Sequence, residues 1–295
     1  MPSLIKPLKG IRIVSLALNL PGPAAFMRCR ALGATCIKVE PLAAGGGDPM
    51  RAYNPAAYAQ MHAGMRTLEL DLKTPQGQAK LGLELDKADV LLTSFRPSAL
   101  KRLGLDWPSL RKRHPALWQV AIVGGEGDAA EVAGHDLTYL AEHGLVTGLD
   151  LPATLYADMA GSLLAVEAIL GAALQVKMAA KPRQISVSLG DAAKYVALPR
   201  SWGLTTPSGA VGGAHAGYQI YQCKDGRAAV AALEPHFAKN LCKLAGIDGI
   251  DGIGIATMMQ PKTLADLKRW FAKQTCAELG VLALQHDLPI YTLKP

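Results

Sequence analysis

Short β-rich runs alternate with longer helical stretches through the first two thirds of the chain. The strand-like runs are rich in Val, Ile, Leu and Thr and lie at residues 11–17, 35–40, 66–70, 89–93 and 117–123. Residues 24–32 and 75–87 carry helical patterns, and Gly33 follows the first of them in the position that commonly ends a helix. Because parallel strands need such crossovers, the alternation predicts a parallel sheet covered by helices on both faces.

The remaining third of the chain has a different pattern. The longest helical stretch, 159–178, precedes a strand at 184–189, and a Pro/Gly-rich stretch at 199–217 indicates a linker. Two alternating runs then flank Lys224-Asp225-Gly226 as a β-hairpin, with further helices expected at 235–244 and 263–275. The predicted organisation is therefore a large α/β domain (1–198), a linker (199–217) and a small α+β domain (218–295).

Composition supports a globular chain. Of 295 residues, 50% are hydrophobic and 19% charged, which argues against disorder. Apolar stretches such as 163–176 are interrupted by Glu, Gln or Lys before they reach the roughly 18 apolar residues of a membrane span. The N-terminus shows no signal-peptide pattern, so we expect no membrane association and a cytoplasmic location.

Cysteine usage and charge narrow the choice of ligands. The five cysteines are widely spaced and form no CxxC pair, so they indicate reduced, mostly buried thiols and neither a disulfide framework nor a zinc ribbon. The net charge of +7 favours an anionic partner. Aromatic residues make up only 5%, which favours a phosphorylated small molecule over nucleic acid.

Several common catalytic motifs are absent. The turn after the first strand, residues 19–24, reads NLPGPA and not GxGxxG, which disfavours NAD. There is no GxSxG, P-loop or HExxH sequence, and no His pair has metal-ligand spacing, so metal catalysis is not expected. The remaining candidates are His135, Asp136, Asp158 and Glu234, which stand where loops meet predicted helices.

Each candidate also has a purely structural interpretation. Asp158 directly precedes the predicted long helix, and the residue alone favours an N-cap over a catalytic group. Asp136 is likewise a cap candidate, Glu234 precedes a proline suited to the first helical position, and His135 fits an ordinary buried histidine. A basic cluster between residues 96 and 113 is more typical of a solvated face than of a phosphate site. The residues alone thus indicate a two-domain α/β protein with an anionic ligand.

A series of short motifs carries a family resemblance across nearly the whole chain. In order they are LKGIRIV (8–14), GP (22–23), LGATCIKVEP (32–41), GDPMR (47–51), LDLK (70–73), ADVL (88–91), FRP (95–97), RLGL (102–105) and YQCKDGR (221–227). Together they resemble the family III CoA-transferases, the CaiB/BaiF group, which includes α-methylacyl-CoA racemases. Gly134-His135-Asp136 and the segment ALEPHF at 232–237 are similar to the racemase branch.

The resemblance implies a fold and a set of roles. It implies a Rossmann-like parallel-sheet large domain plus a smaller α+β domain, acting on acyl-CoA without metal or NAD. Asp158, with His135 and Glu234, would move the proton next to the thioester, and backbone N–H groups just after Asp158 would stabilise the enolate. The residues matching CoA-binding positions are Lys38, Arg96, Arg102, Gly134 and Tyr139.

The racemase-like hypothesis has two alternatives. In the transferase branch, the aspartate matched by Asp158 attacks the acyl-CoA. A third interpretation is a CoA-binding paralogue with weak or no turnover.

The resemblance also implies a homodimer in which Glu234 acts across the interface. Since family members continue beyond the position of residue 295 with a closing tail, we expect this dimer to dissociate more easily.

Overall fold

The computed structural model describes residues 5–42, 47–247 and 254–294. The chain forms two compact units that divide between Ala197 and Leu198. The segment expected as a linker contains the one-turn helix α10 (Leu198–Ser201) and a short helical turn at Ala210–Ala214. Each unit has its own hydrophobic core.

The first unit is built on a six-stranded parallel sheet with the strand order β3-β2-β1-β4-β5-β6. The strands are β1 (Arg12–Ser15), β2 (Thr35–Glu40), β3 (Arg66–Glu69), β4 (Val90–Thr93), β5 (Trp118–Val123) and β6 (Gln184–Ser188). All six had been expected, and their parallel pairing confirms the α/β prediction. In register, Val14 of β1 lies opposite Ile37 of β2 and Leu91 of β4.

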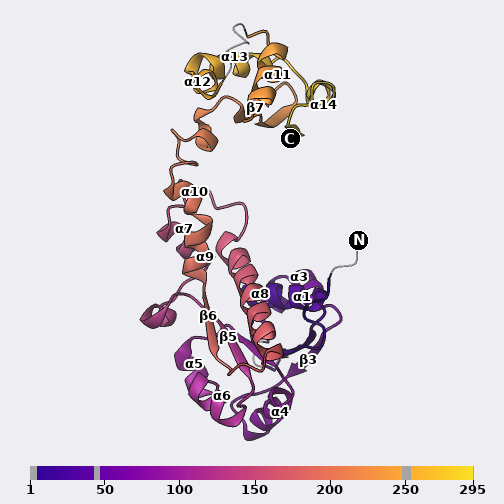
Figure 1. Ribbon diagram of the computed structural model, residues 1–295, viewed down its shortest axis with the longest axis vertical. Coiled ribbons are helices and arrows are strands. Elements are labelled where there is room, and N and C mark those ends of the chain that lie inside the picture. The colour runs from indigo at the N-terminus through magenta and orange to yellow at the C-terminus, as the bar shows by residue number, and fades with distance from the viewer. Residues whose placement is uncertain (1–4, 43–46, 248–253, 295) are drawn as a thin grey trace. The chain divides into compact units, whose positions relative to one another are not determined.

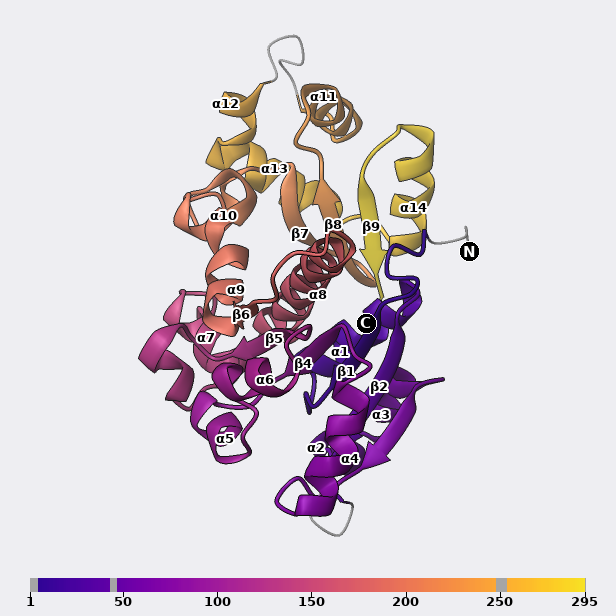
Figure 2. The same cartoon turned by 60° about the horizontal axis from the view of Figure 1, so that its bottom comes forward.

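Helices cover both faces of this sheet, as Figure 1 shows. Successive strand residues point to opposite faces, so Ile13 packs with α1 (Pro21–Ala31) and α8 (Tyr156–Lys177), while Val14 joins the other core. That second core includes side chains of α4 (Pro75–Leu85), α5 (Pro97–Arg102) and α6 (Trp107–Arg113). Figure 2 shows the strands from a second direction. Burial on both faces explains why the strands are continuous apolar runs.

Local sequence signals fix where these helices begin. α1, α4, α5 and α6 each start with a proline in the first turn, and the Thr74 and Asp106 side chains cap α4 and α6. Gly33, with φ of 99°, follows the C-cap of α1 in the left-handed region, as predicted. The other helices of the unit are α2 (Pro49–Tyr53), α3 (Pro55–His62), α7 (Asp136–Glu142) and α9 (Leu189–Val196), with a 3₁₀ turn at Gly127–Glu131.

Helix α8 is the longest element among the described residues, and apolar side chains lie on both its buried and its exposed faces. Its inner face, with Ala165 and Ile169, lies in the core against the sheet. By length and composition alone this helix could also cross a membrane. Its packing against α1, α9 and strands β4 to β6 is that of a core helix, although Leu163 and Leu174 remain exposed.

The second unit is a small α+β fold. Strands β7 (Tyr218–Cys223) and β8 (Gly226–Ala231) form the predicted hairpin, and β9 (Ile290–Leu293) completes an antiparallel sheet in the order β7-β8-β9. Besides α10, the helices that the structure describes in this unit are α11 (Pro235–Leu244), α12 (Ile255–Met258), α13 (Pro261–Phe271) and α14 (Cys276–Gln285). Tyr221 stacks on Phe271 at a ring separation of 4.4 Å in the core of this unit.

Candidate active site

The strand order of the first unit reverses between β1 and β4. From β1 the chain proceeds to β2 and β3 on one side, and from β4 to β5 and β6 on the other. In open α/β sheets the crevice at the carboxyl ends of such strands is the usual ligand site. The loops that leave these two strands are joined there, because Leu18 N–H donates to Ser94 Oγ at 3.1 Å.

A cavity of about 280 Å³ opens at this position. Five of the eight residues predicted for the site line it, namely Arg96, Gly134, His135, Tyr139 and Asp158. They come from the loop after β4, the loop after β5, and the first turns of α7 and α8. The structure therefore brings together, within one unit, residues that are up to 62 positions apart in the sequence, from Arg96 to Asp158.

Asp158 is the third residue of α8 and not its N-cap, so the capping prediction is wrong. The N-cap is Leu155, which makes no side-chain capping bond. The Asp158 N–H instead donates to Oδ1 of Asp136 at 3.0 Å, so the free amide at the start of α8 is satisfied by a carboxylate from α7. Asp136 is only 5% exposed. This arrangement leaves the Asp158 carboxylate free to line the cavity.

The surroundings of Asp158 raise the pKa of its carboxyl group. Burial, and then the nearby Asp136 carboxylate, raise the pKa of Asp158 from its ordinary 3.8 to about 6, while His135 acts in the lowering direction. A carboxyl group with this pKa exchanges protons readily near neutral pH. Aspartate in a solvated N-cap would not have this property.

His135 stands directly before α7 and is exposed to solvent. Its backbone is fixed by Thr138, whose hydroxyl accepts from the His135 N–H at 3.0 Å and donates to the His135 carbonyl oxygen at 2.8 Å. The structure thus places an imidazole on the wall of the cavity that also holds Asp158, and not in the core. The interpretation of His135 as a buried histidine is wrong.

Tyr139 forms one side of the cavity, and its ring lies against Gly124 and Gly134. A Cβ atom at Gly124 would lie 2.5 Å from the Tyr139 hydroxyl, and one at Gly134 would lie 2.6 Å from it. Only glycine at both positions lets the ring sit here. Burial, followed by the Asp158 charge, raises the pKa of Tyr139, so its hydroxyl stays protonated and can donate a hydrogen bond.

The backbone groups expected to stabilise an enolate are placed differently from the prediction. The Met159 N–H, just after Asp158, donates to the Leu155 carbonyl oxygen at 3.0 Å inside α8. It is therefore engaged in the helix and does not face a ligand. The protonated hydroxyl of Tyr139, which the resemblance matches to a CoA-binding position, is a hydrogen-bond donor on the cavity wall.

Lys38 lies away from solvent, in the interior of the unit. Its Nζ atom is fully buried and donates to Asp48 Oδ2 at 2.7 Å and to the Ala17 carbonyl oxygen at 2.6 Å. Asp48 in turn accepts from the Asn19 N–H at 3.0 Å. A direct contact with a CoA phosphate does not fit this burial. The ammonium instead holds the loop after β1, which lines the cavity.

Asn19 is a site residue that sequence reasoning did not single out. It adopts a left-handed conformation with φ of 71°, lines the cavity, and its side chain accepts a hydrogen bond from the Tyr53 hydroxyl. Asn tolerates this conformation better than most residues. Strained backbone of this kind is concentrated at functional sites. The available signal was an Asn in the short loop between the first strand and a proline-glycine turn.

A second cavity, of about 340 Å³, adjoins the first through Phe95, which lines both. It lies beyond the carboxyl ends of β2 and β3 and is lined by Pro41, Leu72 and the exposed Lys73. Arg96 and Arg102 are also exposed, at the two ends of α5. Lys73 was missed as a candidate because a lone lysine after a strand carries no signal of its own.

Glu234 belongs to the second unit. It is the exposed N-cap residue of α11, directly before Pro235 in the first helical position, as its structural interpretation predicted. Its side chain makes no capping bond. A catalytic role for Glu234 stays a prediction.

The sequence model of CoA-transferase family III matches residues 8–294. The chain belongs to CoA-transferase family III. This confirms the resemblance, and the fold of the family is confirmed by a solved structure: the Rv3272 protein of Mycobacterium tuberculosis superposes with a TM-score of 0.82 at 26% identity, over 97% of this chain and 82% of that one.

Relatives within family III carry the names of two enzyme types. The chain is 30% identical over 278 residues to the succinate–glutarate CoA-transferase of Agrobacterium fabrum, covering 85% of this chain and 69% of the relative. It is 28% identical over 283 residues to the human α-methylacyl-CoA racemase, covering 90% of this chain and 71% of the relative. The chain is therefore a member of an enzyme family that acts on acyl-CoA substrates, shorter than these relatives.

Proposed function

We propose that this family III member transfers a proton at the carbon next to the thioester of an acyl-CoA, as an α-methylacyl-CoA racemase does. The observation that carries the proposal is the pairing of Asp158 and His135 on one cavity. Inversion requires one group to remove the α-proton and another to return it on the opposite face, each with a pKa near neutral pH. The Asp158 pKa of about 6 suits that task.

The two adjoining cavities support an extended CoA thioester as ligand. The apolar walls of Pro41 and Leu72, with Lys73 at the edge, suit the adenosine end, and Phe95 leads from there to the Asp158 cavity. Arg96 and Arg102 supply cations for the phosphates between the two ends. Tyr139 and Gly134 then flank the thioester, with the Tyr139 hydroxyl available to the enolate oxygen.

Incubation of a single enantiomer of a 2-methylacyl-CoA in deuterated water tests this proposal. The proposal requires deuterium at the α-carbon together with loss of chirality. Retention of both the α-proton and the configuration would rule it out.

CoA transfer is the second candidate, favoured by the 30% identity to a CoA-transferase. In that reaction the Asp158 carboxylate attacks the thioester carbonyl and expels the CoA thiolate, leaving an acyl-aspartyl anhydride. Hydroxylamine traps such an anhydride as a hydroxamate on the Asp158 peptide, which mass spectrometry detects. A modified Asp158 identifies the transferase, whereas the racemase reaction leaves the peptide unmodified. A third reading, binding of CoA without turnover, predicts saturable CoA binding and no change in any thioester.

A homodimer is part of the proposal, since the family resemblance assigns Glu234 to the site of the partner subunit. The exposed apolar side chains Leu163 and Leu174 on α8 support an interface on the first unit. Asp158, His135 and Glu234 would then form one shared site.

A further inference from the structure

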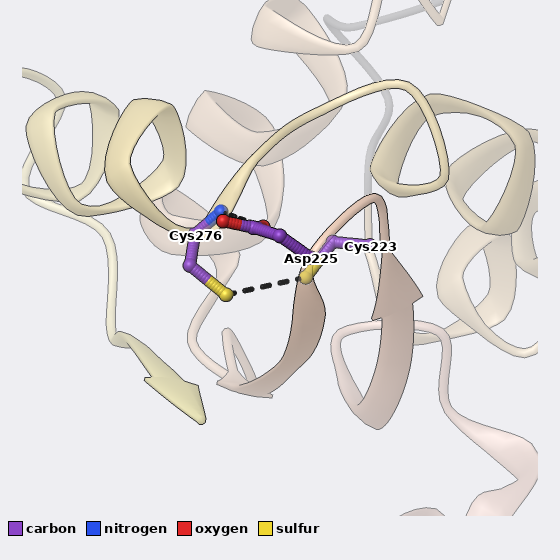
Figure 3. Close-up of side chains that lie close together, drawn as sticks. All are labelled: Cys223, Asp225 and Cys276. Carbon is purple, nitrogen blue, oxygen red and sulfur yellow. Dashed lines mark hydrogen bonds between the residues drawn. The ribbon is translucent and has the colours of Figure 1, made fainter. Parts of the chain in front are cut away.

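A second cluster of chemically active side chains lies in the unit 198–295. Figure 3 shows its three members, Cys223 at the end of β7, Asp225 in the hairpin turn and Cys276 at the start of α14. Their ligand atoms all lie within 4.8 Å of one another. Thiolates and a carboxylate are ligand types that bind Zn²⁺ in proteins.

The spacing of the two thiols fits a shared metal ion. The Sγ atoms of Cys223 and Cys276 are 3.6 Å apart. Two thiolates on one tetrahedral zinc ion, each with a bond of about 2.3 Å, are roughly 3.8 Å apart, so only a small movement is needed. Gly226 leaves space for the sulfur, because a Cβ atom there would lie 2.8 Å from Cys276 Sγ.

Asp225 is already oriented toward the cysteines. Its Oδ1 atom accepts a hydrogen bond from the Cys276 N–H at 2.6 Å, which fixes the carboxylate at the start of α14. Asp225 is exposed whereas both thiols are buried, so a hydrated cation can approach from the Asp225 side. Two thiolates and the Asp225 carboxylate would together neutralise the positive charge of a bound divalent cation.

We propose that Cys223, Asp225 and Cys276 bind one divalent cation of the zinc class, with water as the fourth ligand. As each sulfur–metal bond forms, the thiol releases its proton to solvent, so no oxidant or reductant takes part. The bound ion would tie the β7–β8 hairpin to α14 across 53 positions of sequence.

Proton release makes the binding pH-dependent. Both thiols must lose their protons to bind the ion, so protons compete with the metal for the two sulfur atoms.

Titration of the full, reduced, chelator-treated chain with Co²⁺ tests the site, followed by competition with Zn²⁺. One cobalt per chain and a thiolate-to-cobalt charge-transfer band are expected, with the band lost on adding Zn²⁺. Cys223→Ala and Cys276→Ala should abolish the band. Asp225→Asn keeps an acceptor for the Cys276 N–H, and should weaken binding by at least the roughly 10-fold typical of lost supporting groups.

Cys242→Ala is the matched control, because Cys242 is a buried cysteine of the same unit whose Sγ atom contacts Met258. It should bind cobalt like the wild type. The proposal is overturned if the band persists in Cys223→Ala, or if Asp225→Asn binds with unchanged affinity. It is equally overturned if the reduced wild type binds no cobalt at about pH 8.

Discussion

The environment of Asp158 lowers the stability of the folded chain but suits the carboxyl group to proton transfer. Its carboxyl group is held in a partly desolvated position beside the buried Asp136, which disfavours the charged form. The same environment brings the pKa to about 6, where the group can both accept and donate a proton. Active sites commonly give up stability for function in this way.

Replacing Asp158 by Asn should therefore stabilise the protein while removing activity. The carboxyl pKa is about 6 in the folded chain against an ordinary 3.8, so its contribution to stability is fully present below about pH 4 and is lost as the pH rises through 6. Asn has no such loss, and we expect a gain of about 1–3 kcal/mol above about pH 7 that shrinks toward about pH 4. Urea unfolding at several pH values measures it. A gain that does not vary with pH would contradict the assigned cause.

Asp136→Asn separates the charge of Asp136 from its hydrogen bond. The Asn side-chain oxygen can still accept from the Asp158 N–H, whereas the negative charge that raises the Asp158 pKa is gone. The acid limb of the pH–rate profile should move to lower pH with the folded structure retained. Asp136→Leu, which also removes the acceptor, should in addition lower stability by about 1–3 kcal/mol. An unmoved profile in Asp136→Asn would leave Asp136 with a purely structural role.

The loops that follow β1, β4 and β5, with the first turns of α7 and α8, form the cavity of the candidate site. The buried Lys38–Asp48 pair links β2 to the loop after β1, and the Asp48 side chain fixes Asn19 in its left-handed conformation. Lys38, which matches a CoA-binding position in sequence, therefore has a structural role. Only exposed cations such as Arg96 remain as candidates for contact with phosphates.

Arg96→Ala should weaken CoA binding roughly 10- to 100-fold, the effect of one charge-assisted hydrogen bond. The loss should be largest at low ionic strength, because salt screens an exposed pair. Isothermal titration calorimetry measures it, with Lys101→Ala as the matched control. Lys101 is an exposed cation on the same helix, α5, that lines neither of the two cavities. Unchanged affinity in Arg96→Ala would mean that Arg96 does not contact the phosphates.

The sequence was most informative for regular elements. β2 (Thr35–Glu40) and α11 (Pro235–Leu244) lie where they were predicted, because their patterns and their flanking glycine or proline agree. The start of α8 was placed three residues too late, since the residues 156–158 have no capping signature of their own and the supporting carboxylate comes from α7. Contacts between side chains far apart in the sequence, such as that between Cys223 and Cys276, could not be predicted from local sequence patterns.

The role proposed for Glu234 requires that two chains assemble. The second unit has fewer than about 100 residues, and small units bury little surface on their own. We expect a homodimer at micromolar concentration. Sedimentation velocity over a concentration series measures this. A monomer at every concentration would exclude a site shared between two subunits, and with it a role for Glu234.

In the proposed reaction, Asp158 and His135 exchange the α-proton of a bound acyl-CoA. The most direct measurement is the rate of deuterium incorporation at the α-carbon of a 2-methylacyl-CoA as a function of pH. Incorporation is expected, with a pH dependence that contains an ionisation near 6, and it should be lost in Asp158→Asn. Incorporation by Asp158→Asn at the wild-type rate, or none by the wild-type protein, would contradict the proposed reaction.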